Sequence, residues 1–214
     1  MYLSVIVPLY NEEEIAEKTF ATLEQELAEI EHELIFVNDG STDRTREILE
    51  NLLPKTPRNK LINFSRNFGH QAAFSAGLKQ ARGKAVVIID GDLQDPPALI
   101  HDMLKKWEEG YQVVYAQRKK RKGETFFKKA SAHAFYKILH ALTNIDIPMD
   151  TGDFRLMDRI VVDQLNALPE RNRFLRGLVC WVGFKRTGIL YDRKERTAGK
   201  SKYPLRKMLR LAMD

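Results

Sequence analysis

The chain has a single cysteine, Cys180, among its 214 residues, so it holds no disulfide framework and suits a reducing compartment. The first residues lack the basic start, apolar run and small-residue cleavage site of a signal peptide, and we expect none. Long apolar runs are also missing, because stretches such as 85–89 and 178–184 are far shorter than the roughly 20 residues that cross a bilayer. The sequence therefore predicts a soluble, cytosolic type of chain, and its length predicts one domain.

Several common binding motifs are absent. No Gly-x-Gly-x-x-Gly occurs, which argues against dinucleotide binding. Gly199-Lys200-Ser201 is similar to the end of a P-loop, but the glycine that such a loop needs five residues earlier is Lys194. The five histidines show neither His-Glu-x-x-His nor Cys/His spacing. We therefore expect no zinc site, and we interpret most of the histidines as surface or core residues.

Positive charge is concentrated in two segments. Of the 35 basic residues, seven lie in 118–129 with one acidic residue, and ten lie in 185–214 with three. The rest of the chain keeps 18 basic and 25 acidic residues, a net charge of −7, although the whole chain carries +6. Basic segments on an acidic body favour contact with phosphate on a nucleotide, a nucleic acid or a lipid headgroup. Solvated surface lysines are the alternative.

Short apolar runs alternate with helical patterns in the first half of the chain. Strands are predicted at 3–7, 33–37, 60–64, 85–89 and 111–116, and helices at 12–30, 42–53, 69–81 and 96–108. This alternation predicts an α/β fold, a mostly parallel sheet flanked by helices that binds ligands beyond the carboxyl ends of its strands. In the second half we expect helices at 123–143, 158–168, 173–182 and from 204 onwards, and a strand at 184–191.

Polar clusters follow three of the predicted strands, at 8–12, 38–43 and 90–95. Each cluster alone is also typical of an ordinary turn or helix cap. Three clusters at one edge of a sheet favour a binding site instead. Asp90-Gly91-Asp92 is the most informative, because two carboxylates beyond a buried strand suit Mg²⁺ or Mn²⁺, with substrate phosphates completing the shell. Gln94 adds a further oxygen ligand, and an acidic helix N-terminus around Asp95 is the alternative.

The combination of motifs resembles glycosyltransferase family 2. The first motifs that carry the resemblance are Pro8-Leu9-Tyr10-Asn11-Glu12, Val37-Asn38-Asp39-Gly40-Ser41-Thr42-Asp43 and Asp90-Gly91-Asp92. Further segments, at 65–70, 90–97, 151–156 and 199–203, are similar to the branch that transfers sugars to polyprenyl phosphates, such as dolichol-phosphate mannose synthases and bactoprenol glucosyltransferases. The resemblance implies the GT-A fold, a Rossmann-like fold that binds nucleotide-diphospho-sugars, and it covers nearly the whole chain.

The resemblance also implies roles for individual residues. Those implied for the nucleotide-sugar are Pro8, Tyr10, Glu12 and Asp39 in the nucleoside pocket, Asp90 at the diphosphate, and Arg196 and Lys202 closing on phosphates. Asp90, Asp92 and Gln94 are the implied metal ligands, so Asp92 counts as catalytic. Asp153 is the implied carboxylate near the acceptor and the usual candidate for a general base.

A phosphate acceptor reduces the need for that base. The second pKa of a phosphate monoester is near 6, so such an acceptor is already largely a dianion at neutral pH. Asp153 then either removes a proton or only orients the acceptor and stabilises positive charge on the sugar. For the acceptor phosphate itself we expect cations from the basic segment, and we single out Arg118 and Lys129.

The last predicted helix has an apolar stripe opposed by basic residues, a pattern typical of a helix lying on a membrane. Packing of that stripe on the domain is the alternative. We therefore divide the chain into a catalytic domain, 1–202, and a juxtamembrane helix, 203–214. Since relatives of this type continue into transmembrane helices, we expect the protein to continue likewise and to act at the cytoplasmic face of the cell membrane.

The residues and the resemblance together predict a metal-dependent glycosyltransferase, and the resemblance implies that it inverts the anomeric carbon. It would move one hexose or N-acetylhexosamine from a nucleotide diphosphate, UDP in preference to GDP, to a polyprenyl phosphate. Gln-x-x-Arg-Trp, expected of a processive synthase, is missing, which favours a single transfer. The alternatives are a sugar nucleotidyltransferase and a basic nucleic-acid-binding protein, although we expect no nucleic-acid partner. The sequence leaves the oligomeric state open, with a homo-oligomer among the alternatives.

Overall fold

The computed structural model describes residues 1–53, 58–119, 148, 151–171 and 173–192. Its strands are β1 (Leu3–Leu9), β2 (His32–Asn38), β3 (Lys60–Asn63), β4 (Ala85–Ile88), β5 (Val113–Arg118), β6 (Thr151–Asp158) and β7 (Arg186–Tyr191). Its helices are α1 (Ala16–Glu26), α2 (Thr45–Leu52), α3 (His70–Gln80), α4 (Leu99–Glu108), α6 (Arg159–Ala167) and α7 (Leu175–Trp181). The helices predicted at 123–143 and from 204 onwards lie outside the described residues.

The seven strands form one sheet in the order β3-β2-β1-β4-β6-β5-β7. All neighbouring pairs are parallel except the two pairs that β6 makes with β4 and β5. The prediction of a mostly parallel sheet flanked by helices is confirmed, but β6 itself was not predicted from the sequence. Its antiparallel direction brings the beginning of β6, at Thr151–Asp153, to the edge where the parallel strands end.

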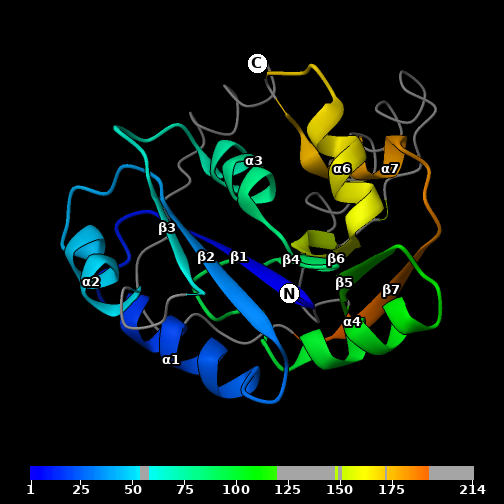
Figure 1. The fold of residues 1–214 in the computed structure, drawn as a ribbon, viewed down its shortest axis with the longest axis horizontal. Coiled ribbons are helices and arrows are strands. Elements are labelled where there is room, and N and C mark those ends of the chain that lie inside the picture. The colour runs from blue at the N-terminus through cyan, green and yellow to red at the C-terminus, as the bar shows by residue number, and fades with distance from the viewer. Residues whose placement is uncertain (54–57, 120–147, 149–150, 172, 193–214) are drawn as a thin grey trace, which may run out of the picture.

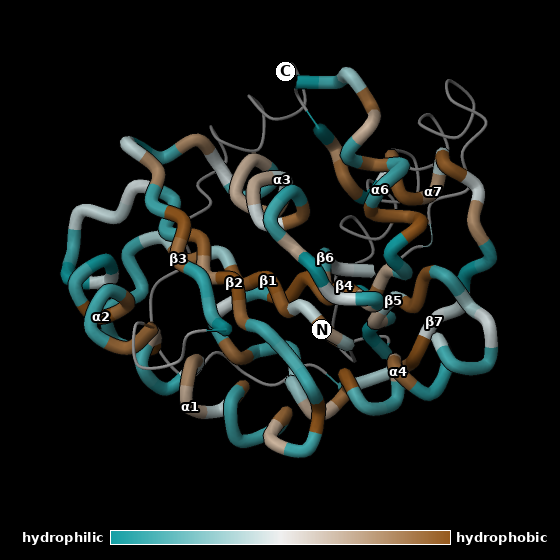
Figure 2. Tube along the Cα trace, in the orientation of Figure 1, coloured by the Kyte–Doolittle hydropathy of each residue, from teal (hydrophilic) through white to brown (hydrophobic). Residues whose placement is uncertain are grey.

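Helices cover both faces of the sheet (Figure 1). Successive residues of a strand point to opposite faces, so Val5 and Val7 pack with the helices α1 and α4, whereas Ile6 packs with α3 and α6. The strands run through the centre as largely hydrophobic segments, while the helices alternate between hydrophobic and hydrophilic residues (Figure 2). Among the described residues, no helix is long and apolar enough to cross a membrane.

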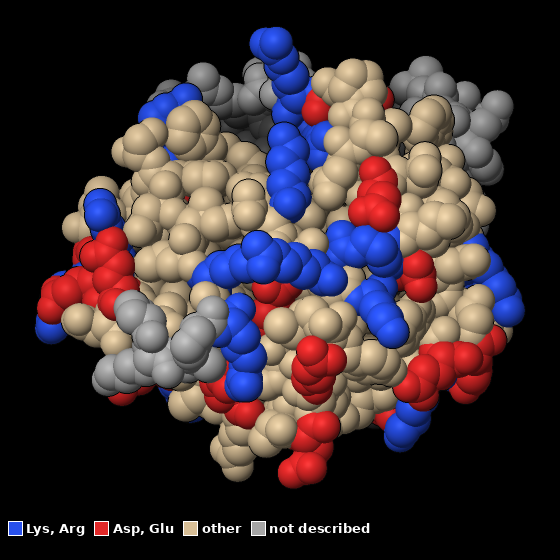
Figure 3. Space-filling model, viewed as in Figure 1, with Lys and Arg blue, Asp and Glu red and all other residues tan. Residues whose placement is uncertain are grey.

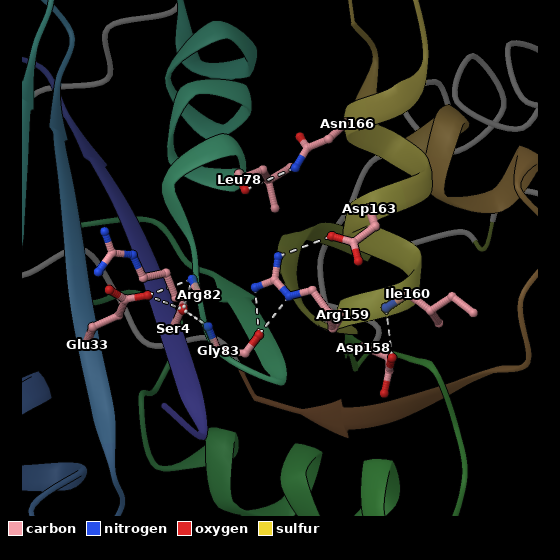
Figure 4. A network of polar contacts seen from close by, with 10 residues as sticks. All are labelled: Ser4, Glu33, Leu78, Arg82, Gly83, Asp158, Arg159, Ile160, Asp163 and Asn166. Atoms are coloured by element: carbon pink, nitrogen blue, oxygen red, sulfur yellow. Dashed lines mark hydrogen bonds and ion pairs between the residues drawn. The ribbon is translucent and has the colours of Figure 1, made fainter.

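The amino edge of the sheet, where the parallel strands begin, is held together by a buried charge (Figure 4). Glu33 is 1% exposed and pairs with Lys60 Nζ at 2.7 Å. Its Oε1 also accepts hydrogen bonds from Ser4 Oγ (2.7 Å) and from Arg82 N–H (2.7 Å). Lys and Arg side chains also gather over this part of the surface, around the N-terminus (Figure 3). Glu33 thus joins β2 to the start of β1, the start of β3 and the turn that precedes β4.

Replacing Glu33 by glutamine is expected to destabilise the fold in a pH-dependent way. Burial alone raises the pKa of Glu33, but the bonds from Lys60, Ser4 and Arg82 outweigh it and hold this pKa below 4.5. Stabilisation by a lowered pKa is present above pH 4.5 and is lost as the pH falls through the folded-state value. We expect Glu33→Gln to lower the free energy of unfolding by about 1–3 kcal/mol at pH 7, measured by urea denaturation.

The difference between the two proteins should shrink steadily as the pH is lowered below 4.5. Glu47→Gln is the matched control, because Glu47 is exposed and its pairing with Arg44 on the surface stabilises little. A difference for Glu33→Gln that stayed constant with pH would contradict the role of the ionised carboxylate.

Candidate active site

The loops that follow β1 and β2 are bound to each other at the carboxyl edge of the sheet. Asn11 N–H donates to Ser41 Oγ at 3.0 Å, and Thr42 N–H donates back to Asn11 Oδ1 at 2.7 Å. Asn11 has a φ of 52°, in the left-handed region that asparagine tolerates. Glu12 N–H donates to Thr45 Oγ1 at 2.8 Å. These bonds place the predicted residues Pro8, Tyr10 and Glu12 together with Asp39 at this edge.

Asp39 is buried and joins the end of β2 to the start of α3. Its Oδ1 accepts a hydrogen bond from Phe68 N–H (2.7 Å), and its Oδ2 accepts from Gly69 N–H (3.0 Å) and Asn67 Nδ2 (2.9 Å). Burial raises the pKa of Asp39, and the two backbone donors partly oppose this. The loops approach so closely that a Cβ on Gly40 would lie 2.1 Å from the carbonyl carbon of Arg66.

The loop after β4 carries Asp90 and Asp92 around a glycine that has no room for a side chain. A Cβ on Gly91 would lie 2.2 Å from Leu9 Cδ2, and the carbonyl oxygen of Gly91 accepts a hydrogen bond from the buried Thr19 Oγ1 at 2.8 Å. Asp92 Oδ1 in turn accepts from Gln94 N–H at 3.1 Å. Gly91 is therefore held against β1 and α1, and the two carboxylates, Asp90 and Asp92, lie on either side of it.

His70, the first residue of α3, brings two of the predicted carboxylates together. Its Nε2 lies 2.8 Å from Asp90 Oδ1 and 3.8 Å from Asp153 Oδ2. Burial lowers the pKa of His70, but the contact with Asp90 and the charge of Asp153 outweigh it, and the pKa is raised above 6.5. Its ring also packs edge-on against Phe74 at 4.4 Å between centroids.

Asp153 lies near the start of β6 and is 5% exposed. Arg176, on α7, pairs with it through two parallel hydrogen bonds, Nε to Oδ1 at 2.8 Å and Nη2 to Oδ2 at 3.0 Å. Burial alone raises the pKa of Asp153, but the bonds and charge of Arg176, with the charges of Arg155 and His70, lower it to about 2. Asp153 is therefore ionised throughout the physiological range.

Arg118, at the end of β5, lies at the same edge. Its Nε donates to Tyr191 Oη at 3.3 Å, and the Tyr191 hydroxyl donates to the buried Asp95 Oδ1. Burial and the bond to Asp95 raise the pKa of Tyr191 to about 12. Desolvation lowers the pKa of Arg118, but Tyr191 and the charges of Asp95 and Asp90 outweigh it, so that its pKa is raised.

The structure therefore gathers most of the predicted site residues at one edge. Those found there are Pro8, Tyr10, Glu12, Asp39, Asp90, Asp92, Gln94, Arg118 and Asp153, whereas Lys129, Arg196 and Lys202 lie outside the described residues. No role was predicted from the sequence for three residues of this cluster, His70, Arg176 and Tyr191. His70 follows the third parallel strand, so the rule that located the other clusters could have located it as well.

The donor atoms suit a metal held jointly with a substrate. Among the residues that the structure describes, no group of three or more His, Cys, Asp or Glu side chains is placed to hold a metal ion by itself. Asp90 and Asp92 offer two carboxylates, and Gln94 adds an amide oxygen on the same loop. Hard cations such as Mg²⁺ and Mn²⁺ are bound by one or two carboxylates together with substrate phosphates. The residues present thus fit a metal that binds with a diphosphate.

The sheet order, the covering helices and the acidic loop beyond β4 define the GT-A fold of glycosyltransferases. The structure is similar to glucosyl-3-phosphoglycerate synthase from Mycobacterium tuberculosis in complex with Mn²⁺, UDP and glucosyl-3-phosphoglycerate, with a TM-score of 0.67 and 19% identity over 99% of this chain and 76% of that one. It is also similar to the mannosyltransferase PcManGT from Pyrobaculum calidifontis in complex with GDP-Man and Mn²⁺, with a TM-score of 0.63 and 19% identity, covering 93% and 58% of the two chains. At this identity the likeness shows the fold.

The chain belongs to glycosyltransferase family 2, whose sequence model, Glycosyl transferase family 2, matches residues 4–165. It is 58% identical over 213 residues to the uncharacterized glycosyltransferase YkcC of Bacillus subtilis, covering 99% of this chain and 66% of that protein. It is 40% identical over 216 residues to the prophage bactoprenol glucosyl transferase homolog of Escherichia coli K12, covering 100% and 71%. The chain spans about two thirds of the length of the curated relatives it matches. The resemblance seen in the sequence is confirmed.

Removing the hydroxyl of Tyr191 is expected to destabilise the site. In Tyr191→Phe, the buried Asp95 loses a donor and Arg118 loses an acceptor, so the free energy of unfolding should fall by about 1–3 kcal/mol. Urea denaturation measures the change. Tyr111→Phe is the control, since Tyr111 contacts Lys185 through its ring and keeps that contact. Equal stability of Tyr191→Phe and the unmodified protein would contradict the bridging role.

Proposed function

We propose that this protein transfers one hexose or N-acetylhexosamine from a nucleotide diphosphate, UDP in preference to GDP, to a polyprenyl phosphate, with inversion at the anomeric carbon. One observation carries the proposal: His70 Nε2 lies 2.8 Å from Asp90, predicted to bind the donor's diphosphate, and 3.8 Å from Asp153, the predicted acceptor carboxylate. Donor and acceptor groups that meet at one point are what a single transfer requires. Relatives that are named bactoprenol glucosyl transferase match this chain end to end and support the choice of acceptor.

On the donor side, Pro8, Tyr10, Glu12 and Asp39 are assigned to the nucleoside. Asp90, Asp92 and Gln94 are assigned to a divalent cation, Mg²⁺ or Mn²⁺, which when bound neutralises the charge that develops on the departing diphosphate. The carboxylate of Asp39 also holds the backbone of Phe68 and Gly69 at the start of α3. Arg196 and Lys202 are assigned to the phosphates.

On the acceptor side, Arg118 and Lys129 are assigned to the lipid phosphate. An oxygen of that phosphate forms a bond to the anomeric carbon while the bond from this carbon to the diphosphate breaks. A phosphate dianion has no proton to lose at this step. Asp153, ionised and paired with Arg176, therefore orients the acceptor and stabilises positive charge on the sugar ring rather than removing a proton.

The same proposal places the protein at a membrane. The basic segment 118–129 and the predicted helix 203–214 would lie against anionic headgroups, where each Lys or Arg contributes about 1 kcal/mol of binding free energy. A catalytic domain over 1–202 then faces the cytoplasm, where nucleotide sugars are available. The names of the bactoprenol glucosyl transferases support this setting, because bactoprenol is a polyprenyl lipid.

Thermal unfolding with a panel of UDP-, GDP-, CDP- and dTDP-sugars, each with Mn²⁺ or with a chelator, tests the donor assignment. A ligand at 100 times its Kd adds about 2.7 kcal/mol to the free energy of unfolding, roughly 5–10 °C for a domain of this size. We expect such a shift with a UDP-sugar and Mn²⁺, and its loss with the chelator. No shift with any donor, in a protein that unfolds cooperatively, would contradict the proposal.

Asp92→Asn is expected to abolish this ligand-induced shift, because it removes one of the two carboxylates assigned to the cation. The melting temperature without ligand should stay close to that of the unmodified protein. Asp102→Asn, on the exposed side of α4, removes the same charge outside the loop and should keep the full shift. A full shift in Asp92→Asn would contradict the assignment of Asp92 to the metal.

Asp153→Asn is expected to slow transfer to a short polyprenyl phosphate by about 10²-fold, the low end of the range for acid–base assistance. Donor affinity, measured by calorimetry, should be unchanged. A loss far above 10⁴-fold at unchanged donor affinity would instead identify Asp153 as an essential base.

A further inference from the structure

Asp153 is enclosed by two side chains from different helices. Arg176, from α7, forms hydrogen bonds of 2.8 and 3.0 Å to the two carboxylate oxygens. His70, from α3, lies 3.8 Å from Oδ2. A planar guanidinium that bonds both oxygens fixes the rotation of the carboxylate as well as its position. The carboxylate is therefore held in one orientation before any substrate binds.

The two helices that supply these side chains are joined where they begin. Leu175 N–H donates to Gln71 Oε1 at 3.0 Å, and these two residues are the direct neighbours of Arg176 and His70. The backbone on which Asp153 stands is fixed as well, because the buried Arg155 donates from Nε to the carbonyl oxygen of Asp153 at 3.1 Å and from Nη2 to that of Gly152 at 3.0 Å.

We propose that Arg176 is a positioning residue for glycosyl transfer, which acts through Asp153 by holding its carboxylate in the orientation that meets the acceptor. The inference rests on the proposed function, since it takes Asp153 to face the acceptor. Arg176 touches neither substrate in this role. The proposal adds to the site a residue from α7, a helix from which no site residue was predicted.

The chemistry of the pair explains why an arginine is needed. A lysine carries the same charge but binds as a point and does not fix the plane of a carboxylate. The hydrogen bonds and the charge of Arg176 also lower the pKa of Asp153, to about 2, and so favour its ionised form. A carboxylate with so low a pKa is a poor proton acceptor, so the pair favours a fixed negative charge over a base.

A purely structural role for Arg176, joining α7 to β6, is the alternative, and a double-mutant cycle separates the two. A residue that acts only through Asp153 has no further effect once Asp153 is changed, whereas independent effects add. The cycle consists of Arg176→Gln, Asp153→Asn and the combined variant. Arg171→Gln is the matched control, because it removes one exposed positive charge five residues away in the same segment.

The experiment measures the rate of transfer from a UDP-sugar to a short polyprenyl phosphate, together with thermal unfolding and nucleotide affinity for each variant. We expect Arg176→Gln to lower kcat by about 10- to 100-fold at unchanged nucleotide affinity, Arg171→Gln to change neither, and the combined variant to be as active as Asp153→Asn alone. Arg176→Lys keeps the charge, so it should fold even if Arg176→Gln does not. It should lose about 10-fold alone and nothing further together with Asp153→Asn.

Two results would overturn the inference while the proposed transfer of a sugar to a polyprenyl phosphate stands. In the first, the losses of the two single variants multiply in the combined variant, which indicates an independent structural role for Arg176. In the second, Arg176→Gln transfers the sugar faster, which indicates that Asp153 is a base whose strength Arg176 limits. Failure of the proposed function looks different, because the unmodified protein would then bind the nucleotide and transfer no sugar to the lipid. In that case the inference falls with it.

Discussion

The carboxylate of Asp39 accepts hydrogen bonds from the N–H groups of Phe68 and Gly69, at the point where α3 begins. A negative charge at a helix N-terminus is favourable, because free N–H groups and the helix dipole converge there. This contact joins the end of β2 to the first residue of α3, which is His70. His70 in turn contacts Asp90 and Asp153, so the link between the loop after β4 and the start of β6 depends on this one buried carboxylate.

The two edges of the sheet use charge differently. At the amino edge, Glu33 is paired and hydrogen-bonded entirely within the fold, and it stabilises the junction of several strands. At the carboxyl edge, charged groups from several loops are brought together, and hydrogen bonds hold Asp39, Gly91 and Asp153 in place. Backbone strain lies there as well, since Asn11 and Leu93 both adopt positive φ values, 52° and 54°. Strain of this kind is typical of functional sites, where the surrounding contacts hold a costly conformation in place.

Most of the fold could be predicted from the sequence because the buried parallel strands are continuous apolar runs, as at Ala85–Ile88. β6 could not be predicted in this way. It carries Asp153 and Arg155, charges typical of a loop. Both are buried with partners, since Arg176 pairs with Asp153 and backbone carbonyl oxygens accept hydrogen bonds from Arg155. The carboxylates of the site could be predicted from their positions after strands. Arg176 could not, because it comes from a helix whose place beside β6 is set by tertiary packing.

The central claim is that one edge of the sheet binds both the metal–diphosphate and the acceptor. A crystal structure with Mn²⁺ and a UDP-sugar tests it most directly, since the anomalous signal of manganese locates the ion without interpretation of the protein density. The account predicts one Mn²⁺ coordinated by oxygens of Asp90 or Asp92, with the diphosphate completing its shell and the sugar next to Asp153. Mn²⁺ bound elsewhere, or a nucleotide bound away from these residues, would contradict it.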